Sequence, residues 1–166
     1  TVTPCLNVPP PSFLSFALHH QSDTFATMKN QYSHQDFSRE MAASLRLISH
    51  SAGHDRFFHV SAAEPFTSLD DRLSSIDSPV LIAIDNGETT SGFTSPDCLK
   101  DSRRYCIIIA PPTDNDDSAT IIEAVREAET HLRQVRNVLL ARYGRQIEDI
   151  RFYPSGVIGD NFYGSV

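Results

Sequence analysis

Histidine and carboxylate side chains that lie close together in the sequence are the first place to look for chemistry in this chain. His50, His54, Asp55 and His59 form the densest group of this kind. Imidazole and carboxylate groups bind zinc and iron, and two histidines four residues apart share one face of a helix. Gly53 interrupts the helix that such a pair needs. A helix end followed by a strand is therefore the favoured interpretation, and no metal site is predicted.

A second acidic group comprises Asp114, Asp116 and Asp117, with Asn115 between them. A calcium-binding loop needs alternating oxygen ligands, a central glycine and a glutamate at its twelfth position. This segment has no glycine, and its twelfth position is Val125. Acidic residues also stabilise the positive end of a helix. We therefore expect these acids to precede a helix.

Asp85 and Glu88 flank an Asn-Gly dipeptide directly after an apolar segment. A carboxylate at the end of a strand is a common position for a catalytic group, but Asn-Gly is also a strong turn signal. The chain lacks a nucleophile elbow, a phosphate-binding loop and a dinucleotide fingerprint. We favour a turn and a non-enzymatic protein without a cofactor. The enzyme or ligand-binding alternative uses Asp85, Glu88 and His54 around one pocket.

Composition narrows the class of protein. The 166 residues are 40% hydrophobic and 21% charged, which is typical of one globular domain. The net charge of −7 argues against a general binder of nucleic acid or membrane surfaces. The odd cysteine count, Cys5, Cys98 and Cys106, indicates reduced thiols in a cytoplasmic setting. Pairing of Cys98 with Cys106 stays open.

Residues 1–27 differ from the rest of the chain. They contain no Lys or Arg, a single acid and four prolines. We expect an extended or disordered leader over 1–27 and a single folded domain over 28–166. The alternative is a partner-binding arm in which a neighbouring subunit buries Phe13, Phe16 and Leu18.

Apolar spacing predicts the elements of that domain. A helix is expected over residues 33–49, ended by Gly53, and then a strand over 56–61 and a short helix over 68–75. Two antiparallel strands over 79–85 and 104–110 follow, the first buried on both faces. A long loop over 86–102 is expected to connect them.

The strongest periodic signal is an amphipathic helix over residues 118–143, ended by Gly144. Strands over 150–153 and 161–166 are expected after it, with a turn at 154–156 between them. The last strand reads as unfinished, so we expect a C-terminal continuation. The fold class is α+β: a small, mostly antiparallel sheet packed by one long helix and an N-terminal helix.

This order of elements resembles the tail terminator, or tail completion, proteins of bacteriophages and prophages. The resemblance rests on the arginine-rich strand Arg103-Arg-Tyr-Cys-Ile-Ile-Ile109, the helix over 118–143, and the closing segment Gly156-Val-Ile-Gly-Asp-Asn-Phe-Tyr-Gly164. It covers residues 28–166 and is closest to small prophage proteins of gut bacteria. The chain departs from the family pattern in its leader and in the end of its last strand.

The resemblance implies a structural virion protein that assembles as a homo-oligomeric ring, a hexamer in the family. Such a ring caps the tail tube and joins it to the neck or head, and its subunits are made in the bacterial cytoplasm. The implied partners are further copies of the chain and tail-tube and neck proteins, without sequence-specific nucleic acid or a membrane. A generic adaptor module is a further alternative. The residues expected at interfaces are Asn86, Glu88, Phe93, Arg103, Arg104, Asp160 and Asn161.

Overall fold

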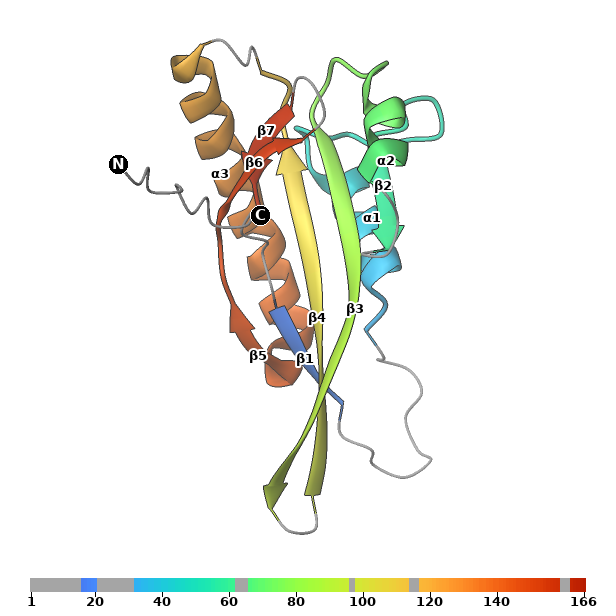
Figure 1. Ribbon diagram of the computed structural model, residues 1–166, viewed down its shortest axis with the longest axis vertical. Helices are drawn as coiled ribbons and strands as arrows, with labels where there is room; N and C mark the ends of the chain where they lie inside the picture. Colours follow the sequence, from blue (N-terminus) through green and yellow to red (C-terminus); the bar gives the residue numbers. More distant parts are fainter. Residues whose placement is uncertain (1–15, 21–31, 62–65, 96–97, 114–116, 159–161) are drawn as a thin grey trace, which may run out of the picture.

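The computed structural model describes residues 16–20, 32–61, 66–95, 98–113, 117–158 and 162–166 (Figure 1). Seven strands of these residues form one sheet, which confirms the α+β class. In chain order the elements are β1 (Phe16–His20), α1 (His34–Ser44), β2 (Phe57–Ser61), α2 (Phe66–Leu73), β3 (Val80–Ser95), β4 (Cys98–Ala110), α3 (Ser118–Tyr143), a 3-10 turn (Gly144–Gln146), β5 (Ile147–Ile150), β6 (Pro154–Ile158) and β7 (Phe162–Ser165).

The sheet is mostly antiparallel. Its strand order is β2-β3-β4-β1-β5, and β7 pairs with both β4 and β6. The β2–β3 pair is parallel, and α2 makes the crossover between these two strands. Along the edge that faces away from β3, β4 pairs with β1 over Asp101–Tyr105 and with β7 at Ile109. β4 is therefore the central strand of the fold.

The two middle strands form the centre of the core. Residues 80–84 of β3 and 106–110 of β4 are almost completely buried. Consecutive side chains of a strand point to opposite faces, so both faces of the sheet are covered here. This confirms the expectation of a strand buried on both faces. It also explains why the segment is a continuous apolar run and not an alternating one.

Helices pack on both faces of the sheet. The guanidinium of Arg39 in α1 lies 5.6 Å from the ring centre of Phe57, and that of Arg72 in α2 lies 4.6 Å from the ring centre of Phe58. Phe57 and Phe58 are neighbours in β2 and point in opposite directions. α1 and α2 therefore lie on opposite faces.

α3 lies beside α1 on the first of these faces. Glu40 of α1 and Arg142 of α3 form a bidentate ion pair, with N–O distances of 2.6 and 2.7 Å. The helix has the predicted bounds. Asp117 is its N-cap and accepts a hydrogen bond from the backbone N–H of Ala119 at 2.9 Å, and Gly144 is its C-cap. With 26 residues, α3 is about 39 Å long and packs on β4, β5 and β7 (Figure 1).

α1 ends earlier than its apolar spacing predicts. It begins after the predicted cap, Ser33, but Leu45 is already its C-cap. The chain then turns, with the N–H of His50 donating to the carbonyl oxygen of Ala42 at 3.0 Å. Ser49 adopts a φ of 49°, in the left-handed region, so the right-handed helix cannot continue through it. The predicted helix end was wrong because Ile48, which has the spacing of a helical core residue, is buried from a turn that follows the helix.

The predicted loop over residues 86–102 is also wrong. β3 continues to Ser95, and β4 starts at Cys98, so most of this segment is a β hairpin. The pairing passes from Asp85↔Tyr105 to Thr89↔Arg103, which leaves three residues of β3 opposite one of β4. Polar β-branched residues such as Thr89 suit a solvated strand, although they carry no apolar alternation.

The expected leader contributes to the sheet. β1 lies within residues 1–27 and pairs with β4 on one side and β5 on the other. The expectation that the fold begins near residue 28 therefore does not hold for Phe16–His20. Phe16–His20 forms a strand because it pairs with two other strands, which come about 85 and 130 positions later in the chain, so the local sequence does not predict it.

The C-terminal strands are displaced from their predicted positions. β5 covers Ile147–Ile150, and the predicted turn at 154–156 is the start of strand β6. Gly156 adopts a φ of 73° where the β6–β7 register shifts, which explains its turn-like composition. β7 agrees with the predicted last strand. Asp114, Asp116, Asp160 and Asn161 lie outside the described residues.

Candidate functional site

The β3–β4 hairpin forms an arm that extends beyond the rest of the domain (Figure 1). We define the arm as residues 89–95 and 98–100. β2 ends opposite Asp85 and β1 ends opposite Asp101, so no other described strand flanks the arm. Phe93 and Leu99 pair across its two strands, with 73% and 54% of their surfaces exposed. The arm therefore presents two adjacent large apolar side chains to solvent.

Two ion pairs hold the base of the arm. Arg103 lies 3.2 Å from a carboxylate oxygen of Asp85, the residue before the irregular pairing. Lys100 forms an ion pair with Glu148 of β5, which also accepts a hydrogen bond from Ser102 at 3.2 Å. Because Arg103 and Lys100 are an odd number of positions apart, they lie on opposite faces of β4. The arm is therefore fixed from both sides.

A buried histidine lies next to this base. His34 is the first residue of α1, and its Nε2 lies 3.1 Å from the carbonyl oxygen of Cys106 in β4. Since a carbonyl oxygen only accepts, Nε2 carries the proton. Nδ1 is then the acceptor, and the hydroxyl of Tyr32 donates to it at 2.9 Å. Both ring nitrogens therefore have partners inside the protein.

Burial governs the acid–base properties of this histidine. It lowers the pKa of His34 to about 4, with a further contribution from nearby His59. Hydrogen bonding to the Cys106 carbonyl and the charge of Asp85 act in the opposite direction but are outweighed. His34 is therefore neutral at neutral pH. Burial likewise raises the pKa of Tyr32 well above its ordinary value.

Aromatic rings surround the histidine. His34 stacks on Tyr105 of β4 with ring centres 4.7 Å apart, and Tyr32 contacts the edge of Tyr105 at 5.4 Å. Tyr143, at the end of α3, lies 5.1 Å from Tyr32. The cluster thus joins the start of α1, the base of the arm and the end of α3. We interpret it as a structural joint, because His34 is 5% exposed and uses both nitrogens internally.

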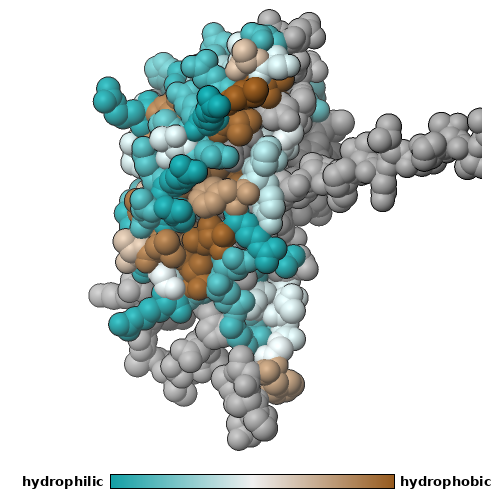
Figure 2. Space-filling model, turned by 90° about the vertical axis from the view of Figure 1, so that its left-hand side faces the viewer, coloured by the Kyte–Doolittle hydropathy of each residue, from teal (hydrophilic) through white to brown (hydrophobic). Residues whose placement is uncertain are grey.

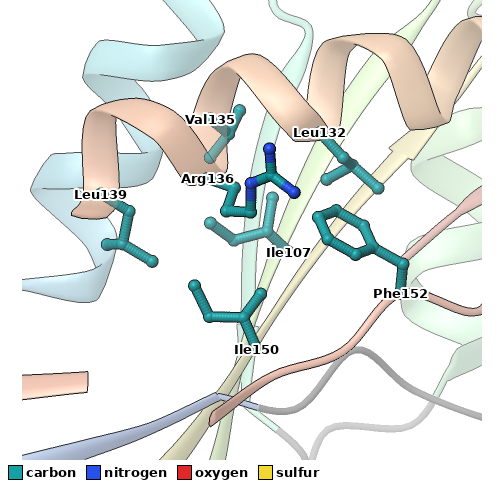
Figure 3. A pocket seen from close by; sticks show the side chains of 7 residues that line it. All are labelled: Ile107, Leu132, Val135, Arg136, Leu139, Ile150 and Phe152. Carbon is teal, nitrogen blue, oxygen red and sulfur yellow. The ribbon is translucent and has the colours of Figure 1, made fainter. Parts of the chain in front are cut away.

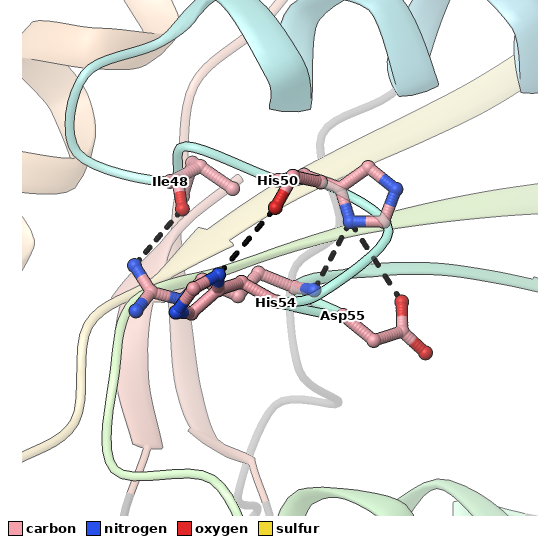
Figure 4. Close-up of polar contacts among 6 residues, drawn as sticks. Ile48, His50, His54 and Asp55 are labelled. Carbon is pink, nitrogen blue, oxygen red and sulfur yellow. Dashed lines mark hydrogen bonds and ion pairs between the residues drawn. The ribbon is translucent and has the colours of Figure 1, made fainter.

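The histidines considered as metal ligands have separate roles, and Figure 4 shows the contacts of His50 and His54. His50 Nδ1 accepts a hydrogen bond from the backbone N–H of Arg56 at 3.2 Å and lies 3.7 Å from Asp55. The hydrogen bond requires an unprotonated Nδ1, so it conflicts with an ion pair to Asp55, and we favour the shorter contact. His54 belongs to an exposed turn, whereas His59 faces His34. Within the described residues, no three His, Cys, Asp or Glu side chains are placed to hold a metal ion.

The structure does not bring together the residues of the enzyme alternative. Asp85 lies at the end of the β2–β3 pair, opposite Ser61, while His54 precedes the first paired residue, Phe57. The four residue-to-residue steps of β2, from Phe57 to Ser61, span about 13 Å. The carboxylate of Asp85 is occupied by Arg103. The side chain of Glu88 is not among those described.

A shallow apolar groove lies between α3 and the segment that follows β5 (Figure 3). Its cavity of about 10 Å³ has room for about one water molecule. Arg136 is the one polar residue of its lining and lies 5.7 Å from the ring centre of Phe152. Figure 2 shows apolar atoms along the middle of this side of the molecule, bordered by hydrophilic ones. The lining residues are Ile107, Leu132, Val135, Arg136, Leu139, Ile150 and Phe152.

The predicted interface residues are distributed around the arm. Phe93 lies near its tip, and Arg103 and Arg104 lie in β4 at its base. The backbone of Asn86 and Glu88 belongs to the irregular part of β3. Sequence reasoning missed Leu99, which only the cross-strand register places beside Phe93. It also missed the joint around His34, because the partners of that histidine are remote in sequence.

No protein-family model, no curated protein and no solved structure matches this chain. In the part of the chain that the structure describes, none of the helices combines the length and the apolar character needed to cross a membrane.

Proposed function

We propose that this protein is a non-enzymatic structural subunit of a bacteriophage tail, which assembles as a homo-oligomeric ring, caps the tail tube and joins it to the neck. The observation that carries the proposal is the arm with its exposed pair, Phe93 and Leu99. A solitary subunit gains nothing from two large apolar side chains at the end of a fixed projection. A subunit that contacts neighbours or a tube uses them as an anchor.

The polar groups of the domain support the same proposal. Asp85 is paired with Arg103, and His34 is enclosed between Tyr32 and the Cys106 carbonyl. These contacts position α1, the arm and α3 relative to one another. A subunit whose role is shape and contact needs this rigidity.

The proposed setting is the virion tail, with assembly in the bacterial cytoplasm. Partners are further copies of the chain, the tail-tube protein and the neck proteins. The net charge of −7 suits a ring through which DNA passes without adhering. This role involves no sequence-specific nucleic-acid contact and no membrane.

The test uses the full chain, because β1 belongs to the sheet. Size-exclusion chromatography with light scattering measures the mass of the protein alone and after incubation with the tail-tube protein of the same phage. Negative-stain electron microscopy then locates it on assembled tubes. A ring at one end of each tube, with elongation stopped, is the expected result. A chain that stays monomeric in both conditions and leaves tube growth unchanged contradicts the proposal.

A further inference from the structure

The joint around His34 has a second property, its response to acid, which is independent of the function proposed above. We propose that the joint is an acid-sensitive switch: neutral His34 holds the start of α1 against β4, and protonated His34 releases that start while the rest of α1 stays on the sheet. The switch reaches the base of the arm. His34 stacks on Tyr105, whose ring centre also lies 5.6 Å from the guanidinium of Arg103.

The hydrogen bonds of His34 fit a neutral ring in a buried site. Nε2 donates to the carbonyl oxygen of Cys106 at 3.1 Å, and Nδ1 accepts from the hydroxyl of Tyr32 at 2.9 Å. A proton on Nδ1 turns this acceptor into a donor, so the bond from Tyr32 cannot persist in its present direction. The side chain is also 5% exposed, and a charged imidazole is more stable in water than in such a site.

The groups that face His34 from the sheet do not offset this cost. The ring centre of His59 in β2 lies 6.4 Å away, and His59 contributes to lowering the pKa of His34. Asp85 of β3 favours the cation, but its carboxylate lies 3.2 Å from the guanidinium of Arg103 in β4. Tyr105, also in β4, presents its ring to the imidazole. The sheet therefore offers His34 no carboxylate that is not already paired.

The helix that carries His34 disfavours the cation as well. His34 is the first residue of α1, where unpaired N–H groups give the helix a positive end. Asp36, the acid of the first turn, is exposed and accepts a hydrogen bond from Ser33 at 2.7 Å. From α3, Tyr143 faces the joint through its contact with Tyr32 at 5.1 Å. Protonation of His34 is therefore best accommodated by moving the ring into water.

The rest of α1 has anchors of its own. Three apolar side chains along the helix are buried: Phe37, Met41 and Leu45. Glu40 is paired with Arg142 of α3, which lowers the pKa of Glu40 from its ordinary 4.5, so the pair stays charged between pH 6.5 and pH 4.5. Residues 32–34, in contrast, are held by the bond from His34 to Cys106 and by ring contacts of Tyr32 and His34. Release of the first turn therefore leaves the remainder of the helix in place.

The direction and size of the response follow from linkage. The pKa of His34 is about 4 in the closed joint and 6.5 once the ring is in water. Between these values the open form binds a proton that the closed form does not bind. The closed joint is therefore fully favoured above pH 6.5 and loses that advantage as the pH falls towards 4. From pH 7.5 to pH 4.5 the ratio of open to closed joints should rise about 70-fold.

Pulsed electron double resonance on the full chain measures the opening as a distance between two spin labels. Alanine replaces the three natural cysteines, Cys5, Cys98 and Cys106, and the Cys106 carbonyl is retained. The test pair is Gln35→Cys with Ser75→Cys, and the control pair is Ala43→Cys with Ser75→Cys. All three positions are exposed, and Gln35 and Ala43 lie at opposite ends of α1.

The two pairs are expected to respond differently to acid. At pH 4.5 the distances of the test pair should gain a broad second component that disappears when the pH returns to 7.5, while those of the control pair stay unchanged. His34→Gln, which keeps a donor for Cys106 but does not titrate, should abolish the second component. His54→Gln, on an exposed histidine, should leave it in place. An unchanged test pair, equal broadening of both pairs, or a His34→Gln variant that still opens would overturn the inference.

Hydrogen exchange of the unmodified chain tests the same opening without any substitution. After correction for the effect of pH on free amides, exchange in a peptide over residues 35–39 should rise at pH 4.5 and should be insensitive to low concentrations of urea, as expected for a local opening. Exchange over residues 80–84 of β3 should stay slower and should increase with urea. If both peptides exchange at the same rate and with the same urea dependence, the joint does not open separately and the switch is refuted.

Discussion

Replacing His34 with glutamine is expected to remove most of an acid-dependent loss of stability. Glutamine carries an N–H group that can donate to the Cys106 carbonyl, but it does not titrate. In the unmodified protein, the pKa of His34 is about 4 when folded and returns to its ordinary value of 6.5 when unfolded. Between these values the unfolded chain binds the proton and the folded chain does not. Stability is therefore fully present above pH 6.5 and is lost as the pH falls towards 4.

The size of this effect follows from the difference between the two pKa values. Each pKa unit corresponds to about 1.4 kcal/mol, so the full loss is about 3 kcal/mol, of which about 2 kcal/mol is lost by pH 5. His34 is almost fully buried, so solvent screening reduces this value little. Protonation would place an N–H against the Tyr32 hydroxyl, which must then rotate to accept.

The assay is urea unfolding at a series of pH values, with the free energy of unfolding compared between the unmodified protein and His34→Gln. Between pH 7.5 and pH 4, the free energy of unfolding of the unmodified protein should fall by about 3 kcal/mol more than that of His34→Gln. His54→Gln, which alters an exposed histidine, is the control and should run parallel to the unmodified protein. If His34→Gln also runs parallel, the assignment of a buried neutral imidazole is refuted.

Three further predictions concern the free energy of unfolding at neutral pH. Ser38 in α1 has a buried hydroxyl without a hydrogen-bond partner, so Ser38→Ala should stabilise the protein by about 1 kcal/mol. Ser44→Ala removes a hydrogen bond to the carbonyl oxygen of Met41 and should not stabilise the protein, so equal effects of the two substitutions would contradict the prediction. Gly156→Ala should cost about 1 kcal/mol because φ is 73°, and Gly92→Ala, at a position with open space and no such φ, should cost less. Ile82→Ala in the buried part of β3 should lower the free energy of unfolding by about 2–5 kcal/mol, whereas Ile122→Ala on the surface should lower it little. Similar losses for the two variants in denaturant unfolding would contradict the burial of Ile82.

Local patterns predicted the elements whose signals lie within one continuous segment. The long helix over 118–143 has buried residues at helical spacing, from Ala124 to Leu139, and an N-terminal cap at Asp117. The strand after Pro79 is apolar without interruption because both of its faces are covered. In each case the signal depends on neighbours only a few positions away.

Pairing between remote segments decided the features that local patterns missed. The polar residues of the arm become a strand because β4 lies beside them, and Phe16–His20 becomes a strand because β4 and β5 flank it. A strand obtains its hydrogen bonds from another segment, whereas a helix obtains them from itself. This difference explains why the helix over 118–143 was predicted correctly while the arm was predicted as a loop.

The sequence by itself determined the α+β class, the bounds of α3 and the buried centre of the sheet, because hydrophobic spacing acts over short distances along the chain. Tertiary structure alone decided which side chains meet: Phe93 with Leu99, His34 with Tyr105 and Cys106, and Asp85 with Arg103 in place of His54. These contacts arise from strand register and helix packing, since the residues involved are separated in the chain and share no local pattern.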